Sequence, residues 1–120
     1  MDNDTTLSAL KEIVKTFCVE RDWDQFHNAK DLSIGIITES AELLDHFRFK
    51  SSSEIEEMFN DSIKKLKITE ELSDVLFFVL RFAQMFDIDL TAELIRKIQI
   101  NNAKYPIDKC KGSNKKHSEV

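Results

Sequence analysis

The chain has 120 residues, of which 42% are apolar and 32% are charged, so it is long enough for one domain with a hydrophobic core and too apolar for a disordered protein. Its net charge of −5 argues against a nucleic acid as a polyanionic partner, and no apolar run is long enough for a membrane span. The polar N-terminal sequence is unlike a signal peptide, so we expect a cytoplasmic protein with reduced thiols.

Chain-breaking residues are rare, with two Gly and one Pro in the whole sequence, which indicates long helices. The first helix is predicted to begin at a cap on Thr5 or Thr6 and to end near Arg21, because its apolar residues recur every ~3.6 positions. The sequence WDQFHNAKD, residues 23–31, breaks this period. It is predicted as a connector with at most one short helical turn.

The middle of the chain is predicted to form two helices joined by a loop. Asp31 is expected to cap a helix over residues 32–47, and residues 48–53 are expected to be the loop. Ser53 and Glu56 have the spacing of a capping box, in which each side chain bonds the other residue's backbone N–H. This pattern predicts a short helix that ends near residue 60.

Two further helices are predicted in the last half of the chain. A long apolar pattern covers residues 62–86, and Asp89 can cap a last helix over residues 90–104. After the single proline, residues 107–120 are expected to be a flexible polar tail. We therefore predict one all-α domain over residues 1–106, built as an antiparallel helix bundle.

Two pairs of acidic residues interrupt the apolar faces of the predicted helices. Glu39 and Glu42 lie one turn apart on one helix face, and Glu71 and Asp74 have the same spacing on the long helix. A carboxylate buried without a partner costs several kcal/mol or takes up a proton. The pairs are separated by 28 residues, which allows one helix to end and the next to return alongside it. Four carboxylates could then converge between two antiparallel helices.

Such a cluster repels itself unless a cation neutralises it, and an all-oxygen ligand set favours Mg²⁺, with Mn²⁺ as a substitute, over zinc. Mg²⁺ usually keeps several waters and completes its shell with substrate phosphates. The spacing therefore suggests a Mg²⁺ site for a phosphorylated substrate. The alternative is that each acidic pair lies on a solvated helix face and binds no metal, and spacing alone leaves the two interpretations open.

A basic stripe and a group of aromatic residues could complete such a site. Lys97, Asn101 and Lys104 share one face of the last predicted helix and could hold a polyphosphate, or they could form a solvated basic face. The following aromatic residues could form a pocket or fill the core: Trp23, Phe26, His27, Phe49 and Phe78.

The order of these motifs resembles that of the MazG-like all-α nucleoside triphosphate pyrophosphatases, in particular the dCTP pyrophosphatase branch. The resemblance rests on four stretches in order and covers most of the chain, from about Leu7 to Pro106. They are FCVERDWDQFH, ITESAELLDHFRFK, EELSDVLFFVL and KIQINNAKYP.

This resemblance implies hydrolysis of a (d)NTP, with dCTP or a related or modified deoxynucleotide expected, to the monophosphate and pyrophosphate. The residues that would bind Mg²⁺ and act in catalysis are Glu39, Glu42, Glu71 and Asp74. The residues that would bind the substrate are Trp23, Gln25, Phe26, His27, Phe49, Phe78, Lys97, Asn101 and Lys104. The family also implies a homodimer or a homotetramer made of two dimers, and a role in nucleotide-pool housekeeping.

Three positions depart from the dCTP branch, which has Trp in place of Phe49, Tyr in place of Phe78 and His in place of Val14. The base preference is therefore open, and dUTP or a modified nucleotide would also suit the pattern. A non-catalytic helical interaction protein is the alternative from another class. A di-metal oxidase bundle is a second alternative, although Glu42-x-x-x-His46 differs from the Glu-x-x-His spacing of such proteins.

Overall fold

The structure is a computed structural model that describes residues 1–119, and within that range it contains helices and no β-strand. The all-α class predicted from the sequence is therefore confirmed. The chain divides into two compact units, Met1–Asp87 and the part that begins at Ile88. This division falls inside the domain expected over residues 1–106, and the extent of that domain stays a prediction.

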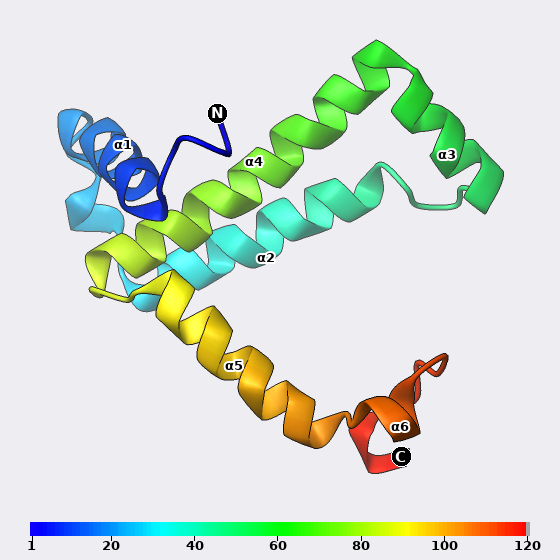
Figure 1. Ribbon diagram of the computed structural model, residues 1–120. Coiled ribbons are helices and arrows are strands. Elements are labelled where there is room, and N and C mark those ends of the chain that lie inside the picture. The colour runs from blue at the N-terminus through cyan, green and yellow to red at the C-terminus, as the bar shows by residue number, and fades with distance from the viewer. Residues whose placement is uncertain (120) are drawn as a thin grey trace. The chain divides into compact units, whose positions relative to one another are not determined.

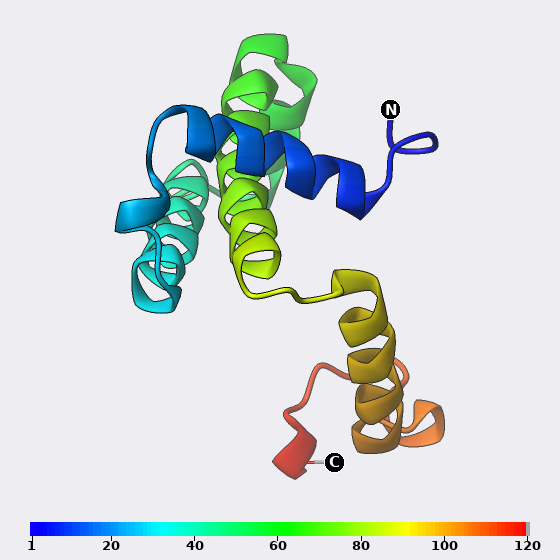
Figure 2. The same cartoon turned by 90° about the vertical axis from the view of Figure 1, so that its left-hand side faces the viewer.

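The first unit is built around two long antiparallel helices. Its elements are α1 (Leu7–Glu20), the short 3₁₀ turn η1 (Asp24–Phe26), α2 (Ala29–Asp45), α3 (Ser52–Asn60) and α4 (Ser62–Met85). The most extensive packing is between α2 and α4, which run side by side in opposite directions (Figure 1). In Figure 2, α1, in blue, crosses α4, in green to yellow-green, so α4 is the central helix of this unit.

Two helix starts differ from the prediction. Asn28, not Asp31, caps α2: its backbone is extended, and its side-chain oxygen accepts the N–H of Asp31 at 2.8 Å. Ser51, not Ser53, caps α3 in a capping box with Glu54. The spacing Ser-x-x-Glu occurs in two overlapping registers here, so the sequence pattern alone selected the wrong one.

Thr6 and Asp89 cap the first helix and the last long helix, as the sequence indicated, whereas no cap was predicted for α4. The Thr6 hydroxyl accepts the N–H of Ala9 at 3.1 Å at the start of α1. Asp61 caps α4, and Asp89 caps α5 (Leu90–Lys104) by accepting the N–H of Ala92 at 2.8 Å. Each side chain satisfies a backbone donor that the first helical turn leaves free.

The second unit consists of α5, one further helical turn α6 (Ile107–Cys110) and the 3₁₀ turn η2 (His117–Glu119). The stretch expected to be irregular after Pro106 thus begins with helix, because Pro106 fixes the backbone just before the first helical residue. Val120, the last residue of the predicted tail, lies outside the described residues.

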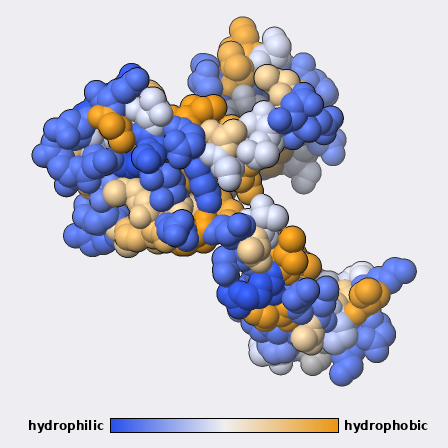
Figure 3. All heavy atoms as spheres, turned by 60° about the vertical axis from the view of Figure 1, so that its left-hand side comes forward, coloured by the Kyte–Doolittle hydropathy of each residue, from blue (hydrophilic) through white to orange (hydrophobic). Residues whose placement is uncertain are grey.

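The buried core is small for a chain of this length. Its apolar members are Val14, Cys18, Leu32, Met58, Ile68, Leu80 and Ala83. Many large apolar side chains are exposed instead, among them Ile37 at 69% and Leu44 at 66% on α2, and Figure 3 shows several patches of apolar atoms on the face it displays. No helix of the described residues has the length and apolar character needed to cross a membrane.

Candidate functional site

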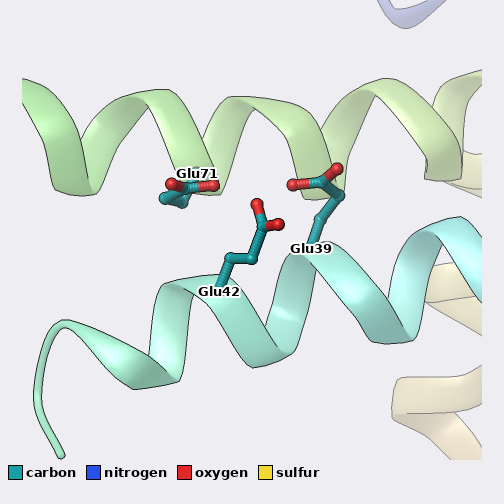
Figure 4. Close-up of side chains that lie close together, drawn as sticks. All are labelled: Glu39, Glu42 and Glu71. Carbon is teal, nitrogen blue, oxygen red and sulfur yellow. The ribbon is translucent and has the colours of Figure 1, made fainter.

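Three carboxylates converge where α2 packs against α4. Glu39 and Glu42 lie one turn apart on α2, and Glu71 lies on α4. One carboxylate oxygen from each lies within 4.8 Å of the other two. Figure 4 shows Glu39 and Glu42 projecting from α2 toward α4, where Glu71 is placed. The antiparallel return of the chain thus brings Glu71 of the second acidic motif beside both residues of the first.

The carboxylate of Glu39 is partly buried and incompletely hydrogen-bonded. Its Oε2 is the only buried side-chain oxygen or nitrogen in residues 1–119 without a hydrogen-bond partner. Burial, together with the neighbouring carboxyls of Glu42, Asp74 and Glu71, raises the pKa of Glu39 to about 7. A buried, unpaired oxygen among three acidic groups fits a bound cation, and oxygen ligands fit a divalent ion such as Mg²⁺.

The pKa of Glu71 is raised as well. Burial and the Glu42 carboxyl raise its pKa, while His46 acts in the opposite direction. The Nε2 atom of His46 lies 3.7 Å from Oε1 of Glu71. His46 follows the last residue of α2, so the end of this helix supplies a nitrogen donor at the edge of the carboxylate cluster.

Asp74, the fourth predicted ligand, lies one turn after Glu71 on α4 and is exposed. It is outside the set of three carboxylates whose oxygens lie within 4.8 Å of one another. Its charge still contributes to the raised pKa of Glu39, and both residues line one pocket. Its role as a metal ligand stays a prediction.

An aromatic pocket of about 400 Å³ adjoins the acidic cluster. Glu39 and Asp74 form its acidic wall, and the apolar lining consists of Ile13, Val14, Phe17, Trp23, Phe77 and Phe78. This volume lies within the range of small-molecule sites, and a flat aromatic ring would be in contact with several other rings. Carboxylates and aromatic side chains thus share one cavity inside the first unit.

The rings of the pocket form a continuous chain of edge contacts. Phe17 lies 5.5 Å from Trp23 and 5.8 Å from Phe77, and Phe77 lies 5.4 Å from Phe78, each measured between ring centroids. Sequence reasoning assigned Trp23 and Phe78 to the pocket but missed Phe17 and Phe77. Both lie on predicted helices in apolar patterns that do not distinguish a pocket wall from core.

Gln25, Phe26 and Phe49 are among the predicted pocket residues that do not line this cavity. The Gln25 side-chain amide donates to the backbone and the carboxylate of Asp22, each at 3.0 Å. Phe26 is 62% exposed, which excludes core filling for it within this chain. Phe49 is 91% exposed and has a positive φ of 63°, with the guanidinium of Arg48 4.7 Å from its ring. Their assignment to the substrate site stays a prediction.

His27 does not line the cavity, but its ring contacts that of Trp23, which does. Its ring lies 6.2 Å from that of Trp23, and its Nδ1 accepts a hydrogen bond of 2.9 Å from Nε of Arg81 on α4. Arg81 is buried and also pairs with Asp24 of η1. Sequence reasoning assigned no role to Arg81 or Asp24, because nothing in their spacing indicates that residues so far apart meet.

Gly35 on α2 leaves room for the ring of Phe78, which projects from α4. A Cβ atom at Gly35 would lie 2.6 Å from two carbons of that ring, which is closer than packed carbon atoms approach. The absence of a side chain at this position therefore lets α4 place an aromatic ring close against α2. The pocket depends on this close approach.

Gly35→Ala is expected to displace the Phe78 ring and to lower the Tm, even though alanine is the better helix former. Phe78→Leu should relieve the clash, so adding Gly35→Ala to it should raise stability by up to about 1 kcal/mol. Thermal melts followed by circular dichroism on the two single variants and the double variant give both comparisons. An unchanged Tm for Gly35→Ala alone would show that the ring can move without cost.

The three predicted phosphate-side residues lie on α5 in the second unit. Lys97 and Lys104 are exposed, and Asn101 is partly buried, with its backbone carbonyl accepting the N–H of Tyr105 at 2.8 Å. The Lys104 carbonyl lies 3.0 Å from Nδ1 of His117. The two lysine ammonium groups therefore face solvent within their own unit, and their role toward a phosphate stays a prediction.

Comparisons with known proteins agree with this geometry. A profile of the MazG-like family matches residues 34–120. Proteins named dCTP pyrophosphatase 1 from Rattus norvegicus and Homo sapiens are 31% and 30% identical to the chain over 115 residues, which cover 96% of this chain and 68% of each relative. The crystal structure of a pyrophosphatase from Archaeoglobus fulgidus is 33% identical and superposes with a TM-score of 0.77, covering 83% of this chain and 92% of that one. The chain belongs to the MazG-like family, as its sequence motifs indicated.

Proposed function

We propose that this chain is a Mg²⁺-dependent nucleoside triphosphate pyrophosphohydrolase that converts dCTP, or a related or modified deoxynucleotide, to the monophosphate and pyrophosphate. The broad enzyme class, nucleoside triphosphate pyrophosphatase, follows from the family and from the similarity to dCTP pyrophosphatases. One observation supports the site most strongly. The orphaned, buried oxygen of Glu39 lies in a cluster of three carboxylates beside an aromatic pocket.

The chain's own residues suit the two halves of such a substrate. The rings of Trp23, Phe17 and Phe78 present apolar faces and edges to a base, while the carboxylates lie at the other wall of the pocket. Anionic phosphates would be repelled by these acids alone, so a divalent cation held by Glu39, Glu42 and Glu71 would supply the charge neutralisation that hydrolysis needs.

A general base is also needed to take a proton from the attacking water. Glu42 is the exposed member of the three clustered carboxylates and is therefore the best placed to meet water. Glu39 is poorly suited to this role without a cation, because its raised pKa of about 7 keeps it largely protonated below that pH. Glu42 is accordingly our first choice for the base.

Product analysis tests the reaction directly. The purified chain would be incubated with each common dNTP and NTP, with Mg²⁺, with Mn²⁺ and with EDTA, and phosphorus NMR would identify the products. We expect monophosphate and pyrophosphate only with a divalent ion, with the highest rate on a pyrimidine deoxynucleotide. Diphosphate and orthophosphate would indicate another phosphohydrolase, and no turnover of any nucleotide, modified ones included, would contradict the proposal.

The exposed apolar residues support a second part of the proposal, a homodimer or a homotetramer in a nucleotide-pool housekeeping enzyme of the cytoplasm. Ile37 and Leu44 project from α2, and Ile63 and Leu66 from α4, with more than half of each side chain exposed. Large exposed apolar surfaces commonly mark contacts with another chain. Light scattering is expected to give two or four times the single-chain mass, and a monomer would exclude this assembly.

A further inference from the structure

Arg81 stands apart from the other charged residues of this protein. It is 1% exposed, and no other charged or polar residue of the described chain is fully buried. Removing a guanidinium from water is costly unless its N–H groups find acceptors in the protein. The acceptors that contact Arg81 therefore indicate which groups this buried charge holds in place.

The donors of Arg81 reach across the sequence to the connector between α1 and α2. Its Nε donates to Nδ1 of His27 at 2.9 Å, one terminal nitrogen donates to the carboxylate of Asp24, and the other donates to Gln84 on α4 itself. The partners on the connector precede Arg81 by 54 and 57 residues. A planar guanidinium has donors on fixed sides, so it holds the two groups in one relative position.

The bond to His27 also fixes the state of its ring. Since Arg81 can only donate, Nδ1 of His27 must be the unprotonated nitrogen, which leaves the proton of the neutral ring on Nε2. Burial and the Arg81 charge lower the pKa of His27, so the neutral form is favoured near neutral pH. A neutral ring can then pack against Trp23 without carrying a charge into the aromatic wall.

Trp23 is the pocket residue that this contact holds. It begins the connector, its ring contacts those of Phe17 and His27, and it lines the cavity that Glu39 and Asp74 share. Its side chain is 38% exposed, so burial alone does not fix it. Arg81 does not line the cavity itself, and any effect on a ligand must pass through the connector.

We propose that Arg81 is a positioning residue for the nucleotide pocket, which clamps His27 and Asp24 and thereby holds Trp23 in the pocket wall. The proposal rests on the proposed function for the identity of the ligand. The clamp itself can be observed without any substrate, because Trp23 is the only tryptophan in the chain and its fluorescence reports on the connector directly.

The test replaces Arg81 by methionine, which keeps much of the side-chain volume and removes every donor. We expect the emission of Trp23 to shift to longer wavelength and acrylamide to quench it more strongly in the folded variant. With dCTP and Mg²⁺, KM should rise about tenfold while kcat stays within about threefold of the parent. The reason is that Trp23 would contribute to substrate binding and not to the chemical step. Arg81→Lys should not restore either property, since a single ammonium group cannot donate to both partners in the geometry of the planar guanidinium.

Arg96→Met is the matched control, because Arg96 is an exposed arginine whose recorded partner is Glu93 on the same helix. It should change neither fluorescence nor KM. If Arg81→Met does not fold, Asp24→Asn decides the question, because the Asp24 side chain is 56% exposed and its replacement removes only the charge partner of the clamp. It should shift both readouts in the same direction by a smaller amount.

Unchanged fluorescence and KM in folded Arg81→Met would overturn the proposal. If Tm and kcat fell while fluorescence and KM stayed unchanged, Arg81 would be a purely structural residue and the proposal would also be wrong. A parent protein that turns over no nucleotide would refute the proposed function instead. The fluorescence comparison would then still decide whether Arg81 holds Trp23.

Discussion

Glu71→Gln is expected to lower kcat/KM for Mg²⁺-dependent hydrolysis by about 100-fold or more, because it removes one charge of the cluster that would hold the cation. The helical content should be unchanged, since Glu71 makes no backbone contact that the helix needs and glutamine keeps its shape. Steady-state kinetics at a Mg²⁺ concentration that saturates the parent, with circular dichroism as the check on folding, measures both quantities.

Glu70→Gln is the matched control for this experiment. Glu70 precedes Glu71 on α4, is exposed, and lies outside the acidic cluster, so the same chemical change there should leave kcat/KM within about twofold. Raising Mg²⁺ should partly restore Glu71→Gln if the loss comes from weaker metal binding. Full activity of Glu71→Gln would remove Glu71 from the metal site.

The acidic cluster could be predicted because helix geometry makes spacing informative. Residues three apart share a helix face, and a turn between two long helices must return the second along the first. Glu39, Glu42 and Glu71 therefore meet for reasons that are visible in the sequence. Asp74 shows the limit of this argument, because a face is wider than a coordination shell and places a residue only to within several Å.

The rest of the site depends on contacts that no local pattern encodes. The sequence around Arg81 does not distinguish it from other polar residues of α4. Its importance becomes visible only in the structure, where it contacts His27 and Asp24 of the connector. Phe26 and Phe49 are aromatic residues outside the apolar helix patterns, yet both are exposed within this chain. The Ser51 cap illustrates the same point at a smaller scale, since two registers satisfy one motif and the pattern alone does not say which of them forms.

Those exposed aromatic and apolar residues connect the fold to the proposed assembly. A chain that buries so few side chains by itself leaves α2 and α4 with apolar surface on the sides that do not face each other. If a second copy covers these sides, the cluster between the helices is shielded from water as well. The electrostatic cost at Glu39 would then increase in the absence of a cation, and metal binding and assembly would favour each other.

The contribution of Glu39 to the stability of the metal-free protein is expected to fall as pH rises from about 4.5 to about 7, which is the reverse of the usual behaviour of acidic side chains. The lowered pKa of His27 acts in the opposite direction, so the parent is compared with Glu39→Gln. Burial and the neighbouring carboxyls raise the pKa of Glu39 from its ordinary value of 4.5 to about 7, so in this window the folded state keeps a proton that the unfolded state has released. The contribution of Glu39 to the free energy of unfolding therefore falls with rising pH until Glu39 is ionised in both states. Thermal melts in EDTA across this range measure the slope.

Glu39→Gln removes both the titration and the charge, so its Tm in EDTA at pH 8 should exceed that of the parent by on the order of a few degrees. Mg²⁺ should raise the Tm of the parent more at pH 8 than at pH 5, because a cation competes with the proton for Glu39, and it should have little effect on the variant. Glu57→Gln on α3, an exposed carboxylate outside the cluster, should keep the parent's pH slope and its response to Mg²⁺. If the stability of Glu39→Gln in EDTA changed from pH 5 to pH 8 just as that of the parent does, Glu39 would not titrate differently in the folded and unfolded states, and the case for a cation at this point would be lost.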